Sequence, residues 1–227
     1  DSELDIDAII FPQFPPWRMA LISLLAAGEH LMIVRDTLAQ RQLYPSGIYT
    51  VIRGALVGAS QAVWALAPAS RDLRRDRGLA LIREMHTQLI KAHQDHDPTL
   101  LSSTELSALA DQITWSKGRQ TTLTAAMTSG LAVVQTDIVA AAADYVFKTP
   151  KERQAARDLW RRLSGDAHVL GWPMLQRAEY GHPDRHTGLS MAAMTDGLQA
   201  TANAYLGAFR VLKVGWALFD QRGEASG

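Results

Sequence analysis

The sequence predicts an all-α protein, folded as a single-domain multi-helix bundle with long antiparallel helices. Segments rich in Ala and Leu, with apolar residues at helical spacing, alternate along the chain with short runs of Gly, Pro and Ser. Sustained alternation of apolar and polar residues is nearly absent, and no Asn-Gly or Asp-Gly pair joins two alternating segments. Hydrophobic residues make up 47% of the chain and charged residues 20%, which is typical of a globular protein with a core.

The N-terminal half is expected to contain a short arm followed by three long helices. Residues 1–15 are acidic and rich in proline, which favours an extended arm, and the bundle domain is then residues 16–227. Proline near a helix start, serine as an N-cap and proline as a stop signal set the limits of the three helices. These limits are Pro16 to about Gln42, Ser46 to Pro68, and Ser70 to the residue before Pro98.

Four further helices are expected in the C-terminal half, with one long ordered loop before the last of them. Two pairs of residues have capping-box spacing, Ser102 with Glu105 and Thr149 with Glu152, and each pair indicates a helix N-terminus. Residues 171–188 mix helix breakers with bulky apolar side chains, which is typical of an ordered loop. The expected helices are residues 102–115, 121–147 with Gly130 as a candidate interruption, 149–168, and 189–219.

Composition excludes several classes of function. The chain has 23 Lys and Arg and 23 Asp and Glu, so a global electrostatic field for nucleic acid is not expected, although a local basic patch is compatible with this balance. Cysteine is absent, which excludes disulfides, a thiol nucleophile, and zinc or iron–sulfur sites held by cysteine. No glycine-rich phosphate loop, dinucleotide fingerprint or nucleophile elbow is present.

The chain is expected to be soluble and cytoplasmic, without a membrane partner. Its first residues are acidic and rich in proline, unlike the basic and then apolar start of a signal peptide. The longest uncharged stretches, residues 54–70 and 120–136, are too short and too rich in Gly, Ser, Thr and Gln to cross a bilayer.

The expected helix 149–168 carries the candidate functional residues. At about 100° per residue its apolar and polar side chains form two separate stripes, roughly 110–120° apart. The apolar stripe contains Ala156, Leu159, Trp160, Leu163, Ala167 and Leu170. The polar stripe contains Arg157, Arg161, Ser164 and His168. Arg162 lies on the opposite flank, so the helical phase favours Arg161 over Arg162 as the partner of His168.

An arginine and a histidine on one face can cleave a phosphodiester without a metal or a cofactor. His168 would transfer protons as the general acid or base, and Arg161 would bind the scissile phosphate. Arg162, Ser164, Asp166 and Arg157 would support them, with Ser164 orienting substrate or His168 and Asp166 pairing with an arginine. The alternative interpretation is structural, because helical Arg and His residues are common and a half-buried His usually only hydrogen-bonds a neighbouring group.

The stretch from Arg161 to His168, "RRLSGDAH", resembles the Arg…His signature of the HEPN superfamily of helical proteins. The resemblance implies a metal-independent endoribonuclease of a toxin–antitoxin or antiviral defence type. It also implies a homodimer with a composite site, which acts on RNA or binds a nucleotide. The family's Arg is usually followed by Asn, Asp or His, whereas Arg161 is followed by Arg162 and Arg162 by Leu163.

A second hypothesis is a non-catalytic helical dimer that binds a protein, nucleotide or small ligand through residues 171–188. A third is an antitoxin or accessory subunit whose target is a partner protein. Three other groups of residues remain open. The arginines of residues 70–77 could bind phosphate or form ion pairs within a solvated helix start. His93 and His96 could share a metal ion, but no metal site is assigned, because both lie near a helix end where imidazole is favoured by the helix dipole. Arg53 and Glu84 could form a buried pair between helices.

Overall fold

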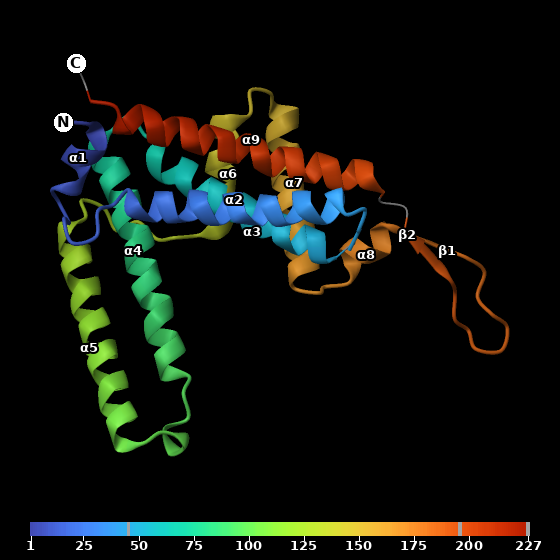
Figure 1. Cartoon of the computed structure of the whole chain (residues 1–227), viewed down its shortest axis with the longest axis horizontal. Helices are drawn as coiled ribbons and strands as arrows, with labels where there is room; N and C mark the ends of the chain where they lie inside the picture. Colours follow the sequence, from blue (N-terminus) through green and yellow to red (C-terminus); the bar gives the residue numbers. More distant parts are fainter. Residues whose placement is uncertain (45, 195–196, 226–227) are drawn as a thin grey trace. The chain divides into compact units, whose positions relative to one another are not determined.

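The computed structural model describes residues 1–44, 46–194 and 197–225, and in these residues the chain is an all-α multi-helix bundle, as predicted. Nine α-helices, one short 3₁₀ helix and one two-stranded hairpin make up the described elements (Figure 1). The α-helices are α1 Glu3–Ala8, α2 Arg18–Ala39, α3 Gly47–Leu66, α4 Arg71–Gln94, α5 Ser103–Ala126, α6 Gln135–Val146, α7 Pro150–Ala167, α8 Trp172–Gln176 and α9 Leu198–Gly223. The 3₁₀ helix is Pro98–Leu100, and the strands are β1 Ala178–Tyr180 and β2 Ala192–Met194.

The chain forms two compact units, and none of the helices in its described part is both long and apolar enough to cross a membrane. Unit 1 contains residues 1–21, 64–134 and 218–227, and unit 2 contains residues 22–63 and 135–217. Neither unit has a limit at residue 15, where the arm was predicted to end. Residues 195–196 and 226–227, which belonged to the predicted last helix and bundle domain, lie outside the described residues.

Both predicted capping boxes are confirmed. The backbone N–H of Glu152 donates to Thr149 Oγ1 at 3.2 Å, and the backbone N–H of Thr149 donates to Glu152 Oε2 at 3.2 Å. The same reciprocal pair joins Ser102 and Glu105 at the start of α5. These bonds satisfy backbone donors that have no partner within the helix. The helix limits predicted from them were therefore accurate at their N-termini.

The prediction was wrong about where α5 ends and α6 begins. The helix expected to end at residue 115 continues to Ala126, and the helix expected over residues 121–147 begins only at Gln135. Asp76 on α4 accepts hydrogen bonds from the backbone N–H of Thr128 at 2.8 Å and from Ser129 Oγ at 2.5 Å. These tertiary hydrogen bonds hold the segment between α5 and α6 in a non-helical conformation, despite its apolar composition.

The segment predicted as a loop over residues 171–188 contains α8 and β1. β1 pairs antiparallel with β2, so the helix expected from residue 189 begins at Leu198 instead. The carboxylate of Asp184 accepts the backbone N–H of Thr187 at 2.8 Å, and Gly188 follows with a φ of 68°. The turn between β1 and β2 is therefore formed around Asp184 and Gly188, and not by the Asn-Gly or Asp-Gly pair that is typical of a short hairpin.

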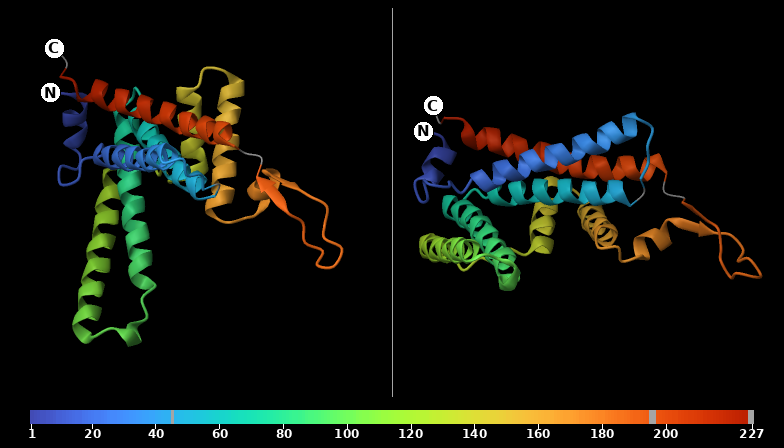
Figure 2. Two further views of the ribbon diagram at one scale, coloured as in Figure 1. Left: turned by 45° about the vertical axis from the view of Figure 1, so that its right-hand side comes forward. Right: turned by 60° about the horizontal axis from the view of Figure 1, so that its bottom comes forward.

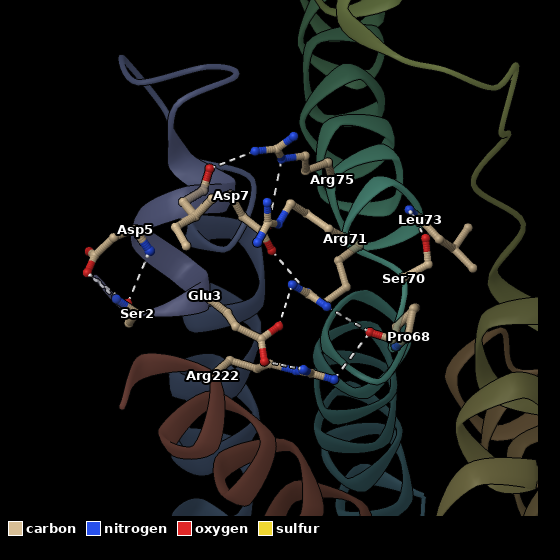
Figure 3. A network of polar contacts seen from close by, with 12 residues as sticks. Ser2, Glu3, Asp5, Asp7, Pro68, Ser70, Arg71, Leu73, Arg75 and Arg222 are labelled. Carbon is tan, nitrogen blue, oxygen red and sulfur yellow. Dashed lines mark hydrogen bonds and ion pairs between the residues drawn. The ribbon is translucent and has the colours of Figure 1, made fainter. Parts of the chain in front are cut away.

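Unit 1 shows that the expected extended arm is wrong, because its residues form α1 and pack onto α4 and α9. Ser2 caps α1 through a capping box with Asp5, and Leu4 and Phe11 are buried. Figure 3 shows Glu3 and Asp7 pointing from α1 toward arginines of α4 and α9. Acidic residues that would repel one another in a free arm are therefore held by cations from elsewhere in the chain.

The arginines Arg71, Arg74 and Arg75, near the start of α4, pair with α1 rather than within their own helix. Arg74, whose side chain is 3% exposed, donates from Nε to Asp7 Oδ2 at 3.0 Å and from Nη2 to Glu3 Oε2 at 2.5 Å. Arg75 Nη2 donates to the carbonyl of Ile6 at 2.7 Å. The prediction of a solvated helix start with internal ion pairs is wrong, because folding brings the α1 carboxylates to this face (Figure 3).

The second half of α4 pairs with α5 in an antiparallel helical hairpin within unit 1 (Figures 1 and 2). His86 of α4 is 4% exposed and contacts the edge of Trp115 on α5, with ring centroids 5.2 Å apart. Burial, and secondly the charge of Arg119, lower the pKa of His86 below its ordinary value of 6.5. Its Nδ1 is buried without a hydrogen-bond partner among the described residues.

Acidification is expected to destabilise unit 1 through His86. Because the pKa of folded His86 is lower than its unfolded value, the unfolded chain binds more protons as the pH falls below 6.5. Stability is therefore full above that pH and is lost as the pH falls toward the folded pKa. Urea unfolding of wild type and His86→Phe at pH values of about 7.5 and 5.5 measures this loss, which the variant should show to a smaller extent. Equal losses would contradict the assignment to His86.

Unit 2 is built around α3, whose residues Ile52, Ala55 and Ala59 are fully buried. Gly58 of α3 faces α2 so closely that a Cβ at this position would lie 2.6 Å from the carbonyl oxygen of Ser23. Only glycine permits this approach of the two backbones. Helices α6 and α7 lie side by side in the same unit, and Arg157 joins α7 to Asp144 of α6 at 2.6 Å (Figure 2).

Candidate functional site

A pocket of about 500 Å³ in unit 2 is the candidate functional site. All of its lining residues belong to this unit, and they come from α3, α7, α8, α9 and the turn before α7. A pocket of this size is typical of small-molecule sites, which span roughly 300–1,000 Å³. The lining includes Tyr49 and Leu56 of α3, Phe147 of the turn before α7, Glu152, Ala155, Leu159, Arg162, Leu163 and Asp166 of α7, Arg177 after α8, and Asn203, Leu206, Gly207 and Arg210 of α9.

The long walls of the pocket are apolar because α7 and α9 turn their small and aliphatic side chains toward it. Leu159 and Leu163 lie one turn apart on α7, as the predicted apolar stripe requires. Gly207 of α9 lies opposite, and a Cβ at this position would lie 3.1 Å from Cδ2 of Leu159. The missing side chain at Gly207 therefore leaves Leu159 room against α9.

A buried ion pair lies at the end of the pocket formed by α7 and α8. Both guanidinium Nη atoms of Arg177 donate to the carboxylate of Asp166, whose side chain is 0% exposed. The Arg177 guanidinium also lies over the ring of Tyr49, 4.5 Å from its centroid. This bidentate geometry is the strongest arrangement of an arginine and a carboxylate. The charges of Asp166 and Arg177 therefore neutralise each other, and the two hydrogen bonds fix both side chains in place.

A second ion pair lies at the pocket end near the start of α7. Arg210 of α9 donates to Glu152 Oε1 from Nη2 at 3.2 Å, and its guanidinium lies 4.9 Å from the ring centroid of Phe147. The backbone and side-chain hydrogen bonds from Thr149, and then the one from Arg210, lower the pKa of Glu152. Glu152 is therefore a carboxylate at neutral pH, and it neutralises Arg210.

Arg162 is the remaining charged residue of the pocket lining. It is exposed, and it makes no hydrogen bond or ion pair with any residue that the structure describes. The lining thus contains three arginines and two carboxylates, with each carboxylate paired to an arginine other than Arg162. One positive charge is available to a ligand.

The hydroxyl of Tyr49 is a second group without a partner. Tyr49 is 5% exposed and lines the pocket, and its hydroxyl is buried with no hydrogen-bond partner in the described part of the chain. A buried hydroxyl without a hydrogen bond costs about 1–3 kcal/mol of stability. A ligand with an acceptor atom near this hydroxyl would recover that free energy.

The structure does not bring the predicted catalytic pair together. Arg161 and His168 are both exposed, and neither side chain contacts the other or bonds any other described residue. His168 is the C-cap of α7, so its seven-residue separation from Arg161 corresponds to roughly 10 Å along the helix axis. Neither residue lines the pocket.

Each of the four predicted supporting residues has a different role in the structure. Asp166 pairs with an arginine, as expected, but the partner is Arg177 rather than a residue of α7. Arg157 binds Asp144, and Ser164 accepts a hydrogen bond from Arg53 Nε at 3.3 Å. Arg162 lines the pocket. Arg53, considered above as a partner of Glu84, places its guanidinium over Trp160, 4.9 Å from the ring centroid, within unit 2.

The sequence did not reveal Tyr49, Arg177, Asn203 or Arg210 as site residues. They belong to α3, α9 and the segment interpreted as a loop, and no local pattern joins positions so distant along the chain. The one available signal was Asp166, a carboxylate next to the apolar stripe of α7, which required a cation from elsewhere.

No metal site is indicated within the described residues, where no group of three or more His, Asp or Glu side chains is placed to hold an ion. The rings of His93 and His96 have centroids 6.3 Å apart.

Comparisons of the chain with protein-family models, with curated proteins and with solved structures find no match. Function therefore has to be inferred from the pocket and from the exposed residues of α7.

Proposed function

We propose that this chain is a non-catalytic protein that binds a small organic ligand in the pocket of unit 2. The observation that carries the proposal is the pocket itself, which has apolar walls along α7 and α9 and polar groups placed by four different helices. Such a combination is typical of ligand sites, in which apolar contact supplies affinity and a few polar groups supply orientation. The ion pairs at the two ends hold the walls in place before a ligand arrives, which reduces the entropic cost of binding.

The pocket is assigned a binding role rather than a catalytic one because both carboxylates of its lining are already paired with arginines. Asp166 and Glu152 accept hydrogen bonds from arginines, so neither is poised to accept a proton from a substrate. No histidine lines the pocket among the described residues. Binding of a ligand, coupled to a partner protein or to a second copy of the chain, is the regulatory role that fits this arrangement.

A bulky residue in the pocket is expected to abolish ligand binding. The probe is phenylnaphthylamine, a neutral apolar dye whose fluorescence rises on binding, and wild type should bind it saturably. Ala155 lines the pocket and is exposed, so Ala155→Trp should fill the pocket without disturbing the core, lowering dye affinity by about tenfold or more. The matched control is Ala217→Trp, at an exposed position of α9 outside the lining.

The two variants separate binding in the pocket from binding elsewhere. Equal dye affinity in wild type, Ala155→Trp and Ala217→Trp would place the dye on another surface and contradict the proposed function. Absence of saturable dye binding to wild type would contradict it as well. Circular dichroism of all three proteins verifies that the substitutions leave the helices intact.

The second candidate function is the metal-independent ribonuclease implied by the resemblance to the HEPN superfamily. One observation favours it: Arg161 and His168 are exposed on one helix and are not engaged by other described residues, so both are accessible to RNA. A homodimer could assemble such residues from two copies into one composite site. Incubation of mixed RNA in EDTA with wild type and with His168→Ala tests this candidate, and identical cleavage by both proteins would remove it.

A further inference from the structure

We propose that the ligand of the unit 2 pocket is an amphipathic organic monoanion whose negatively charged group pairs with Arg162. This inference rests on the proposed function, since it concerns the chemistry of the ligand in the same pocket. Arg162 then determines the specificity of the pocket for a negatively charged ligand, while the aliphatic walls of α7 and α9 bind the apolar part of that ligand.

The charge of the lining favours an anion. Arg177 is neutralised by Asp166 and Arg210 by Glu152, which leaves the guanidinium of Arg162 as the charge without a counterion among the described lining residues. A carboxylate or a similar oxyanion can accept two parallel hydrogen bonds from a guanidinium. A ligand with a positive charge would meet an unbalanced cation and is disfavoured.

The size and walls of the pocket favour an apolar body with one polar end. Leu56, Leu159, Leu163 and Leu206 contribute aliphatic surface, and Arg162 lies three residues after Leu159 and directly before Leu163 on α7. A molecule that places its charged group on Arg162 can therefore place its chain against the neighbouring leucines. Burial of that chain stabilises the complex by about 25 cal/mol per Å² of apolar surface before the cost of association is subtracted.

The unpartnered hydroxyl of Tyr49 is an independent sign of a ligand. Tyr49 is buried to 95%, given its 5% exposure, and its hydroxyl has no hydrogen-bond partner among the described residues. Most buried hydroxyls have a hydrogen-bond partner, so this hydroxyl has the capacity to donate to an acceptor in the pocket. Oxyanions and other oxygen acceptors can accept this hydrogen bond, whereas a pure hydrocarbon cannot.

The experiment compares ligands that share one chain and differ only in the charge of the head group. Decanoate, decanol and decyltrimethylammonium, each below its aggregation concentration, compete with phenylnaphthylamine for wild-type protein. Decanoate is expected to displace the dye at about tenfold lower concentration than decanol, with the cationic compound the weakest competitor.

Arg162→Gln is expected to remove the preference for decanoate over decanol, each measured as displacement of the dye relative to the dye affinity of the same variant. The matched control is Arg161→Gln, because Arg161 is an exposed neighbour on α7 that does not line the pocket. This control should keep the preference of wild type. Both positions are exposed, so neither substitution removes a core contact.

The outcomes distinguish the inference from the function on which it rests. Failure of the dye itself to bind would contradict the proposed function. Binding of the dye with equal displacement by decanoate and decanol would overturn the inference and leave the function intact. An unchanged preference for decanoate in Arg162→Gln, or its loss in Arg161→Gln, would also overturn it.

Discussion

Replacement of Asp7 by alanine is expected to lower the free energy of unfolding by about 3–5 kcal/mol. The Asp7 carboxylate is 5% exposed and accepts Nε of Arg74 at 3.0 Å, and the Arg74 side chain is itself 3% exposed. Removal of one partner leaves an arginine in a site from which water is largely excluded. Glu3 still binds Arg74 Nη2 at 2.5 Å, so part of the neutralisation survives. Urea unfolding followed by circular dichroism measures the change.

Two controls identify the origin of this loss. Asp220→Ala removes an exposed carboxylate of α9 that makes no hydrogen bond or ion pair in the described part of the chain, and should change stability by less than about 0.5 kcal/mol. The double variant Asp7→Ala with Arg74→Met should lose less than the sum of the single variants, because both partners of the buried pair are then gone. A loss below about 1 kcal/mol in Asp7→Ala would show that water reaches Arg74 in solution.

The stability of unit 1 also depends on Arg222, which extends the same network to α9. Its Nη1 donates to Glu3 Oε1 at 2.6 Å, and its Nη2 donates to the carbonyl of Pro68 at 3.3 Å (Figure 3). Burial raises the pKa of Glu3, but the hydrogen bond and charge of Arg222 together with Arg74 and Arg71 outweigh it, and the pKa is lowered overall. Glu3 therefore remains ionised and continues to join the three segments at moderately acidic pH.

Replacement of Asp166 by alanine is expected to lower the free energy of unfolding by about 3 kcal/mol. The carboxylate is fully buried and accepts both Nη atoms of Arg177, whose side chain is 7% exposed. Without it the guanidinium keeps its contact with the ring of Tyr49, but loses the two hydrogen bonds to the Asp166 carboxylate in a buried site. The same urea measurement applies, and the variant should also bind phenylnaphthylamine more weakly because α8 is no longer held against α7.

The matched control for this prediction is Asp158→Ala on the same helix. Asp158 is exposed and accepts only Gln154 Nε2 at 2.9 Å among the described residues, so its loss should cost a few tenths of a kcal/mol, within about 0.5. Similar losses in the two variants would mean that the Asp166–Arg177 pair is solvated in solution. Asp166→Asn, which keeps the shape and one acceptor, should lie between alanine and wild type.

Local patterns along the chain were sufficient to predict the all-α class and the start of α7. The capping residues Thr149 and Glu152 lie three residues apart, and the hydrogen bonds they make are the ones that this spacing predicts. The apolar stripe of α7 was also assigned correctly at Ala156, Trp160 and Leu163, which are buried. These features depend on neighbours within one or two turns, so the sequence contains all of the relevant partners.

The errors occur where a distant residue competes with local preference. Thr128 and Ser129 lie in a segment that favours a helix, but Asp76 binds them and the helix ends at Ala126. Burial raises the pKa of Asp76, and the hydrogen bonds from Ser129 and Thr128 outweigh that effect and lower it, so the anchor is a carboxylate. Likewise, the acidic residues of α1 favoured an extended arm, but arginines of α4 and α9 bind them in the folded chain.

The sequence alone therefore determines the all-α class, the start of α7 and the apolar face of α7, because these features follow from contacts within a few residues. The candidate site depends on the tertiary structure. Asp166 and Arg162 were both recognised on α7, but the folded chain separates them: Arg177 neutralises Asp166, while Arg162 keeps its charge beside the leucines. The partner of a charged side chain determines whether its charge is available, and that partner is a residue far away in the sequence.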